Sequence, residues 1–232
     1  MIGHPTNTPR ATGNIHTPKQ LHIHNDRIYV SDREGLRIHS CKLDGSDHQI
    51  LVQTGDYTKE PEKKADGRFW PVGITVSAKL NKLFWTQKGG PKSQQGRIFS
   101  APLELPKGKT AANRDDIEIV MENLPEPIDL EFDDDRGVLY WTDRGEIPLG
   151  NTLNRKTLVG QAPEAEKALG REIMALGFGE AIGLRMDKKR GVIYVADIAG
   201  RLWECDAAKP APKVKIHEEA GHAYTGLAFV KY

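Results

Sequence analysis

The feature that most constrains the fold of this chain is an internal repeat of about 55 residues. Four short segments, at 28–32, 83–87, 139–143 and 193–197, have the sequences IYVSD, LFWTQ, LYWTD and IYVAD. Their aromatic second residues, Tyr29, Phe84, Tyr140 and Tyr194, are separated by 55, 56 and 54 residues. A period that is kept three times predicts a row of equivalent structural units.

Each repeat contains four short stretches with the composition of β-strands. An apolar stretch opens at Pro18, Pro71, Pro127 or Ala181, the aromatic segment follows, and a glycine-led stretch and a fourth apolar stretch complete the repeat. Four strands bounded by Gly, Asp and Asn turns are typical of a propeller blade. We therefore expect an all-β propeller with blades at 17–57, 69–123, 125–176 and 179–219, an N-terminal extension at 1–16 and a closing strand at 223–230.

Two motifs make the repeat resemble a known family. The segment at 139–143, LYWTD, and the segment at 43–46, LDGS, resemble the YWTD repeat of LDL-receptor class B propellers, and the resemblance covers roughly 17–232. It implies that the aromatic second residues pack between blades and that the motif Thr and Asp hold the turn into the next strand. The Asp positions are Asp32, Asp143 and Asp197, and Gln87 departs from the pattern.

More narrowly, the chain resembles stand-alone fungal and bacterial members of this family that lack EGF modules. Some of them carry the label hydroxyacyl-CoA dehydrogenase. Here no GxGxxG motif opens a helix after a strand, and no βαβ alternation is visible to carry one. We therefore expect no NAD-dependent dehydrogenase.

The number of repeats raises the question of closure, because the family's rings have six blades and four repeats are visible here. Either about two N-terminal blades are missing from this chain, or four units close a smaller or oligomeric assembly. An open ring leaves exposed strand edges, which proteins normally cover. We favour missing blades, with a homo-oligomer hiding the open edge.

Composition limits the partners and the compartment. The chain has 33 basic and 32 acidic residues, so no long-range field favours nucleic acid or an anionic membrane. The N-terminus lacks the apolar region of a signal peptide, and no apolar run approaches the roughly 18 residues of a membrane helix. We expect a soluble, cytoplasmic protein. Cys41 and Cys205 lack CxxC spacing, so we expect two small buried residues.

Ligands of propellers bind where loops surround the mouth of the central channel. The loops that lead into the first strand of each repeat place five residues at nearly corresponding positions: His16, Trp70, Glu126, Glu180 and His222. The loops after the aromatic segments add Arg33, Lys88 and Arg144. Gln20 and Asp129 stand where other repeats have Gly73, Gly183 and Gly226.

A carboxylate in place of glycine costs desolvation unless it is paired, so a partner for Asp129 is expected. We predict Asp129, Glu126 and Glu180 as acid or base groups. The predicted ligand-binding residues are His16, Gln20, Arg33, Trp70, Lys88, Arg144 and His222. The alternative interpretation of each charged residue is a solvated rim of weak salt bridges.

Metal and cofactor chemistry find little support in the sequence. His16, His22 and His24 form an H-x5-H-x-H pattern, but no carboxylate or Cys follows at ligand spacing. No GxSxG motif is present. We expect neither a metal nor an organic cofactor.

Two functions stay open. The first is binding of a small organic molecule, including an anionic one, with isomerase, cyclase, lyase or lactone-hydrolase chemistry. The second is a non-catalytic propeller that docks a protein partner. A deep closed pocket would favour the enzyme, and a broad exposed aromatic patch around Trp70 would favour the partner.

Overall fold

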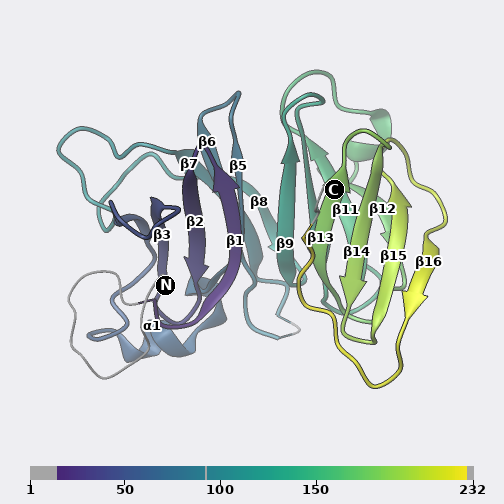
Figure 1. The fold of residues 1–232 in the computed structure, drawn as a ribbon, viewed down its shortest axis with the longest axis horizontal. Coiled ribbons are helices and arrows are strands. Elements are labelled where there is room, and N and C mark those ends of the chain that lie inside the picture. Colours follow the sequence, from purple (N-terminus) through teal and green to yellow (C-terminus); the bar gives the residue numbers. More distant parts are fainter. Residues whose placement is uncertain (1–14, 92, 229–232) are drawn as a thin grey trace. The chain divides into compact units, whose positions relative to one another are not determined.

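The structure, a computed structural model, describes residues 15–91 and 93–228 and is an all-β propeller of four antiparallel sheets (Figure 1). We call these sheets blades 1 to 4, and in each the strands lie side by side in chain order. Blade 1 contains β1 (Pro18–His24), β2 (Arg27–Asp32), β3 (Arg37–Lys42) and β4 (Gln49–Gln53). Blade 2 contains β5 (Pro71–Ser77), β6 (Lys82–Gln87), β7 (Gly96–Pro102) and β8 (Glu118–Leu124). Blade 3 contains β9 (Pro127–Asp133), β10 (Val138–Asp143), β11 (Thr152–Thr157) and β12 (Glu172–Leu176). Blade 4 contains β13 (Ala181–Asp187), β14 (Val192–Asp197), β15 (Arg201–Asp206) and β16 (Val214–Glu218).

Helical structure in the described part is confined to short segments between strands. These are α1 (Pro61–Ala65), the 3-10 helix η1 (Gly67–Phe69) and the 3-10 helix η2 (Glu164–Glu166). No helix of the described residues is long and apolar enough to cross a membrane.

The described chain divides into two compact units. Residues up to Asn123 form unit 1, with blades 1 and 2, and residues from Leu124 on form unit 2, with blades 3 and 4. The core of unit 1 includes Tyr29, Ile74 and Trp85, and that of unit 2 includes Tyr140, Leu184 and Ile193. The two cysteines are free and buried, as the sequence indicates.

A β-bulge recurs near the start of each first strand, between the register pairs of β1 with β2, β5 with β6, β9 with β10 and β13 with β14. A bulge leaves a backbone N–H without a ladder partner. The hydroxyl at the fourth motif position accepts that N–H: Thr86 from Gly73 at 2.8 Å and Thr142 from Asp129 at 3.1 Å. The Thr142 hydroxyl also donates to the Ile182 carbonyl of blade 4 at 2.6 Å. Thr142 therefore links blade 3 to blade 4, whereas the resemblance assigns the motif threonine to the turn.

The motif aspartate ties its strand to the loop that leads into its own blade. Asp143 Oδ1 accepts the backbone N–H of Glu126 and of Gly145, each at 2.9 Å. Asp197 Oδ2 accepts the Gly179 N–H at 2.9 Å, and its Oδ1 accepts the Arg201 N–H at 3.1 Å. The aspartate thus holds two loops: the turn that the sequence predicts and the preceding loop.

Tyr140 shows how the aromatic motif position joins two blades. Its side chain is fully buried and its hydroxyl donates to the Ala207 carbonyl, beyond β15, at 2.7 Å. Tyr194, the counterpart in blade 4, is only half-buried, and its hydroxyl contacts Arg190 of the same blade. The packing role between blades therefore applies to Tyr140, whereas the hydroxyl of Tyr194 contacts an arginine of its own blade.

We expect Tyr140→Phe to lower the free energy of unfolding by about 1 kcal/mol, because it removes one buried hydrogen bond between blades. Tyr194→Phe is the matched control and should change it by less than about 0.5 kcal/mol. Urea denaturation followed by circular dichroism measures both. Equal losses in the two variants would contradict the interblade role of Tyr140.

The expected closing strand differs from the structure. Residues 223–228 have no regular secondary structure, and residues 229 and 230 lie outside the described residues. Gly226 lies against Gly183 of β13, and the Tyr224 N–H donates to the Asp197 carbonyl at 3.2 Å. The edge of β13 already donates its Leu184 and Met186 N–H groups to the carboxylates of Asp129 and Glu131, so these groups are not available for a strand ladder. The predicted extension at 1–16 lies mostly outside the described residues.

Candidate functional site

In unit 1 the structure brings three predicted ligand-binding residues together. Arg33 follows β2, Trp70 precedes β5 and Lys88 follows β6. The Arg33 guanidinium carbon lies 4.9 Å from the centroid of the Trp70 ring, and Lys88 Nζ lies 5.7 Å from it. The Trp70 indole N–H donates to the Lys64 carbonyl at 2.8 Å, which fixes the ring. We call Arg33, Trp70 and Lys88 the Trp70 cluster.

A second aromatic ring with cations lies next to these loops. The guanidinium carbon of Arg37 lies 5.1 Å from the centroid of the Tyr57 ring, and Nζ of Lys64 lies 5.8 Å from it. The His16 ring packs edge-on against the Tyr57 ring, with 5.4 Å between the two ring centroids. His16 is thus placed with Tyr57 rather than with the Trp70 ring. The main-chain groups of Gln20 bond to the Ser31 hydroxyl, at the bulge of β1.

In unit 2 the corresponding residues form a different network. Arg144, after β10, lies between two carboxylates: its Nε is 3.2 Å from Glu126 and its Nη1 is 3.8 Å from Glu180. Glu126 is buried and Glu180 is exposed. Arg144 thus lies within reach of two carboxylates. His222 lies apart from it, 3.4 Å from Glu219.

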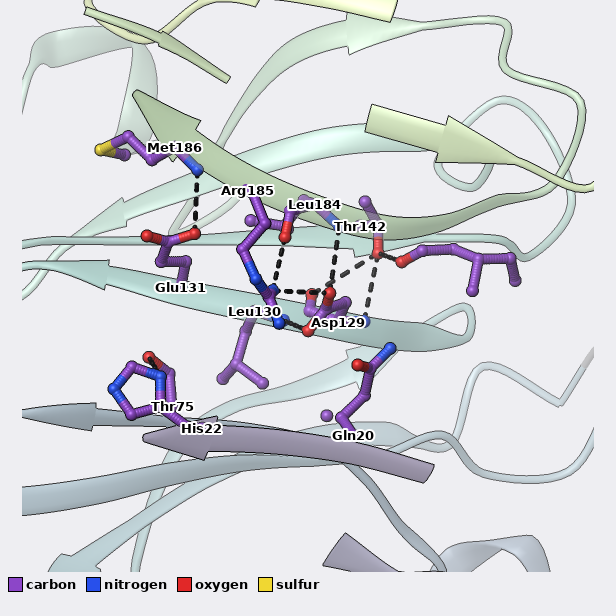
Figure 2. Close-up of polar contacts among 12 residues, drawn as sticks. Gln20, His22, Thr75, Asp129, Leu130, Glu131, Thr142, Leu184, Arg185 and Met186 are labelled. Atoms are coloured by element: carbon purple, nitrogen blue, oxygen red, sulfur yellow. Dashed lines mark hydrogen bonds and ion pairs between the residues drawn. The ribbon is translucent and has the colours of Figure 1, made fainter. Parts of the chain in front are cut away.

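Asp129 is buried in β9 and has the partners that its burial requires (Figure 2). Oδ1 accepts the Leu130 N–H at 2.9 Å, and Oδ2 accepts the Leu184 N–H at 3.0 Å. Oδ2 also lies 3.2 Å from Nη1 of Arg185. The carboxylate therefore connects β9 to the free edge of β13. Burial raises the pKa of Asp129, against the opposing effect of the Arg185 charge.

Glu131 lies two residues further along β9 and repeats this connection. Its Oε2 accepts the Met186 N–H of β13 at 2.9 Å (Figure 2). Burial raises the pKa of Glu131 to about 7, and the negative charge of Asp129 adds to the rise. A carboxyl group with a pKa near neutral pH can both accept and donate a proton.

The sequence interpretation missed Glu131 and Arg185. Both stand two residues after the Gly or Asp position of the first strand, where the other repeats have His22 and Thr75. Alternate residues of a strand share a face, so polar residues at this position were the available signal. In unit 1, Nδ1 of His22 lies 3.5 Å from Oγ1 of Thr75 (Figure 2).

Asp143 shows a second consequence of burial among the motif aspartates. Burial raises the pKa of Asp143 to about 6, and Arg171 opposes the rise. Asp32 behaves in the opposite way: burial raises its pKa, but hydrogen bonds from His39, His16 and Thr17 lower it further than burial raises it. The same motif position therefore has a different acidity in blades 1 and 3.

Over 15–91 and 93–228, no three His, Cys, Asp or Glu side chains are grouped so that they could hold an ion.

Comparison with known sequences gives two fungal relatives with high similarity. The chain is 45% identical over 222 residues to the 3-hydroxyacyl-CoA dehydrogenase-like protein LAM1 of Cochliobolus heterostrophus, covering 93% of this chain and 46% of that protein. It is 37% identical over 236 residues to the low-density lipoprotein receptor-related protein 1 of Pyricularia oryzae, covering 98% of this chain and 72% of that protein. The chain thus spans about half the length of the Cochliobolus relative. No protein-family model matches the sequence.

Solved structures show the same fold at low sequence identity. The nidogen–laminin complex matches with a TM-score of 0.63 and 17% identity, covering 94% of this chain and 69% of the matched one. The PQQ-bound aldose sugar dehydrogenase of Streptomyces coelicolor matches with a TM-score of 0.60 and 16% identity, covering 88% and 64%. The repeat motifs, the four-stranded blades and the Pyricularia relative agree. The chain therefore belongs to the family of YWTD-repeat β-propellers.

Proposed function

We propose that this propeller binds a small organic anion at the Trp70 cluster of unit 1. The observation that carries the proposal is the placement of two cations, from Arg33 and Lys88, at one tryptophan ring. Such a cluster offers an anion both charge and an apolar surface.

The charge around the cluster supports an anionic ligand. Arg37 and Lys64 add two positive charges at the neighbouring Tyr57 ring. Glu34 supplies a nearby negative charge and hydrogen-bonds to Nε of Arg33 at 2.6 Å. In unit 2 Arg144 lies between the carboxylates of Glu126 and Glu180 and no described cation–π contact involves it, so we place the site at the Trp70 cluster, where two cations lie at one ring.

The shape of the cluster favours a small ligand over a protein partner. Trp70 is half-buried and Lys88 is buried, so the ring is no broad exposed aromatic patch. The name of the Cochliobolus relative refers to a hydroxyacyl-CoA, which is an organic anion. Dehydrogenase activity is not part of the proposal, because a Rossmann site needs parallel βαβ units and the four described sheets are antiparallel.

The second candidate is an enzyme that transfers a proton without a cofactor. It is favoured by Glu131, whose pKa is about 7, beside Asp129 and Arg185. Isomerase, cyclase, lyase and lactone-hydrolase reactions all use such a group. Glu126 and Glu180 stay candidates on the rim, and self-association through an open sheet edge stays a prediction.

The proposal predicts that Trp70→Leu weakens anion binding at least ~10-fold, because it removes the ring that the two cations share. Titration calorimetry with a panel of dicarboxylates and acyl-CoA thioesters, with circular dichroism as a check of folding, measures this. Arg144→Gln is the matched control in unit 2 and should change the affinity less than ~2-fold. Binding that survives Trp70→Leu, or no binding by any member of the panel, would contradict the site.

A further inference from the structure

A pocket of about 370 Å³ lies in unit 1, apart from the Trp70 cluster. Its lining residues come from the segment before β5, from the start of β7 and from the end of β8: Arg68, Phe69, Gln95, Arg97, Glu122 and Asn123. The lining carries two guanidinium groups, from Arg68 and Arg97, and one carboxylate, from Glu122. None of these residues belongs to the Trp70 cluster.

Arg97 differs from its counterparts because blade 2 departs from the YWTD motif. The strand registers pair Asp32 with Arg37 in blade 1 and Asp197 with Arg201 in blade 4. In blade 2 the residue opposite Arg97 is Gln87. Arg97 therefore faces a neutral amide where those two blades present an aspartate.

Among the described residues no carboxylate lies within ion-pair distance of Arg97, although Glu122 of the lining and Asp66 act on it electrostatically. Its Nη2 donates to the Arg68 carbonyl at 2.9 Å and to Gln87 Oε1 at 3.3 Å, and no ion pair joins it to any residue of the described part. Burial lowers the pKa of Arg97, and the positive charge of Arg68 adds to this effect, whereas the negative charges of Glu122 and Asp66 oppose it. A guanidinium that is partly removed from water beside a like charge is stabilised by an incoming anion.

The other lining residues define which anion would fit. Arg68 is tied to Asp66, with Nε 2.8 Å from Oδ2, so Arg97 is the guanidinium left for a ligand. Phe69 offers an apolar face, and Lys63 Nζ lies 5.4 Å from the centroid of its ring. The amides of Gln95 and Asn123 add hydrogen-bonding groups.

We propose that this pocket binds the carboxylate of a small organic acid, with Arg97 as its main partner and Phe69 against its apolar part. The site is independent of the proposed Trp70 site. An aromatic monocarboxylate has the charge, the planar oxygens and the apolar body that the lining offers.

Benzoate is a suitable probe, with benzamide as its neutral analogue and inorganic phosphate as a second anion. Titration calorimetry on the full chain should show benzoate binding, with benzamide at least ~10-fold weaker. Arg97→Gln should weaken benzoate at least ~10-fold, and so should Gln87→Glu, which places a carboxylate beside Arg97 in a side chain of nearly unchanged shape.

Arg201→Gln is the matched control, since it removes the arginine at the same repeat position of blade 4. It should leave benzoate affinity unchanged, and circular dichroism checks that each variant is folded. Absence of benzoate binding, equal binding of benzamide, tighter binding of phosphate, or full affinity in Gln87→Glu would each overturn the proposal. A loss with Trp70→Leu alone would assign benzoate to the Trp70 cluster instead.

Discussion

Replacing Asp129 with alanine is expected to lower the free energy of unfolding of unit 2 by about 3 to 5 kcal/mol. The change removes the one acceptor shared by the Leu184 N–H and the Arg185 guanidinium, and it also removes the acceptor of the Leu130 N–H. A buried donor that loses its acceptor costs its full desolvation free energy. Thermal and urea unfolding of the full chain measure the loss.

Asp129→Asn tests the charge of the carboxylate, because asparagine keeps nearly the same shape and is neutral. The amide keeps one acceptor oxygen but turns a donor toward a backbone N–H, so we expect a smaller loss of about 1 to 3 kcal/mol. Glu180→Gln is the control, because this exposed rim carboxylate should contribute less than about 1 kcal/mol. If Asp129→Asn instead unfolds like the native chain and loses ligand binding, Asp129 is the functional group that the sequence suggested.

The repeat architecture follows directly from the sequence, because each blade carries its own strand and turn signals. Residues 139–143 are an aliphatic residue, two aromatic residues, a threonine and an aspartate, in the order that a buried strand and its turn need. Because the aromatic residues recur at a constant spacing, the same local pattern predicts four blades. The closing strand could not be judged in this way, because a strand also requires a neighbouring strand to bond to.

The partners of Asp129 were out of reach of the sequence for a geometric reason. The sequence marked Asp129, since glycine occupies its position in other repeats, and it required a partner. The partner is set by the bulge in β9 and by the edge of β13 that faces it. Spacing alone reveals neither the position of a bulge nor which first strands lie next to each other.

The cross-strand neighbour of Gln87 could not be predicted for a similar reason. Its departure from the motif is visible in the sequence, but its cross-strand neighbour depends on the loop to the next strand. That loop is short between Asp32 and Arg37 and longer between Gln87 and Arg97. Spacing therefore does not reveal that both arginines occupy one repeat position, and the strand register does.

Glu131→Gln is expected to make the protein more stable at pH 8 by up to about 3 kcal/mol and to leave its stability near pH 4 almost unchanged. The pKa of Glu131 rises from 4.5 to about 7 in the folded chain, mainly through burial. Folding thus favours the protonated form, and the stability present below pH 4.5 is lost as the pH rises through about 7. Glutamine keeps an acceptor for the Met186 N–H and carries no charge, so the variant should lack this loss.

The measurement is a series of urea unfolding curves between pH 4 and pH 8 for the native chain and the variant. The charges near Glu131 are those of Asp129, Arg185 and Lys188, and they are the same in both proteins. Glu164→Gln, which changes an exposed carboxylate of unit 2, should keep the native slope. A Glu131→Gln profile parallel to the native one would show an ordinary pKa at Glu131, and would remove the observation that favours proton transfer at this group.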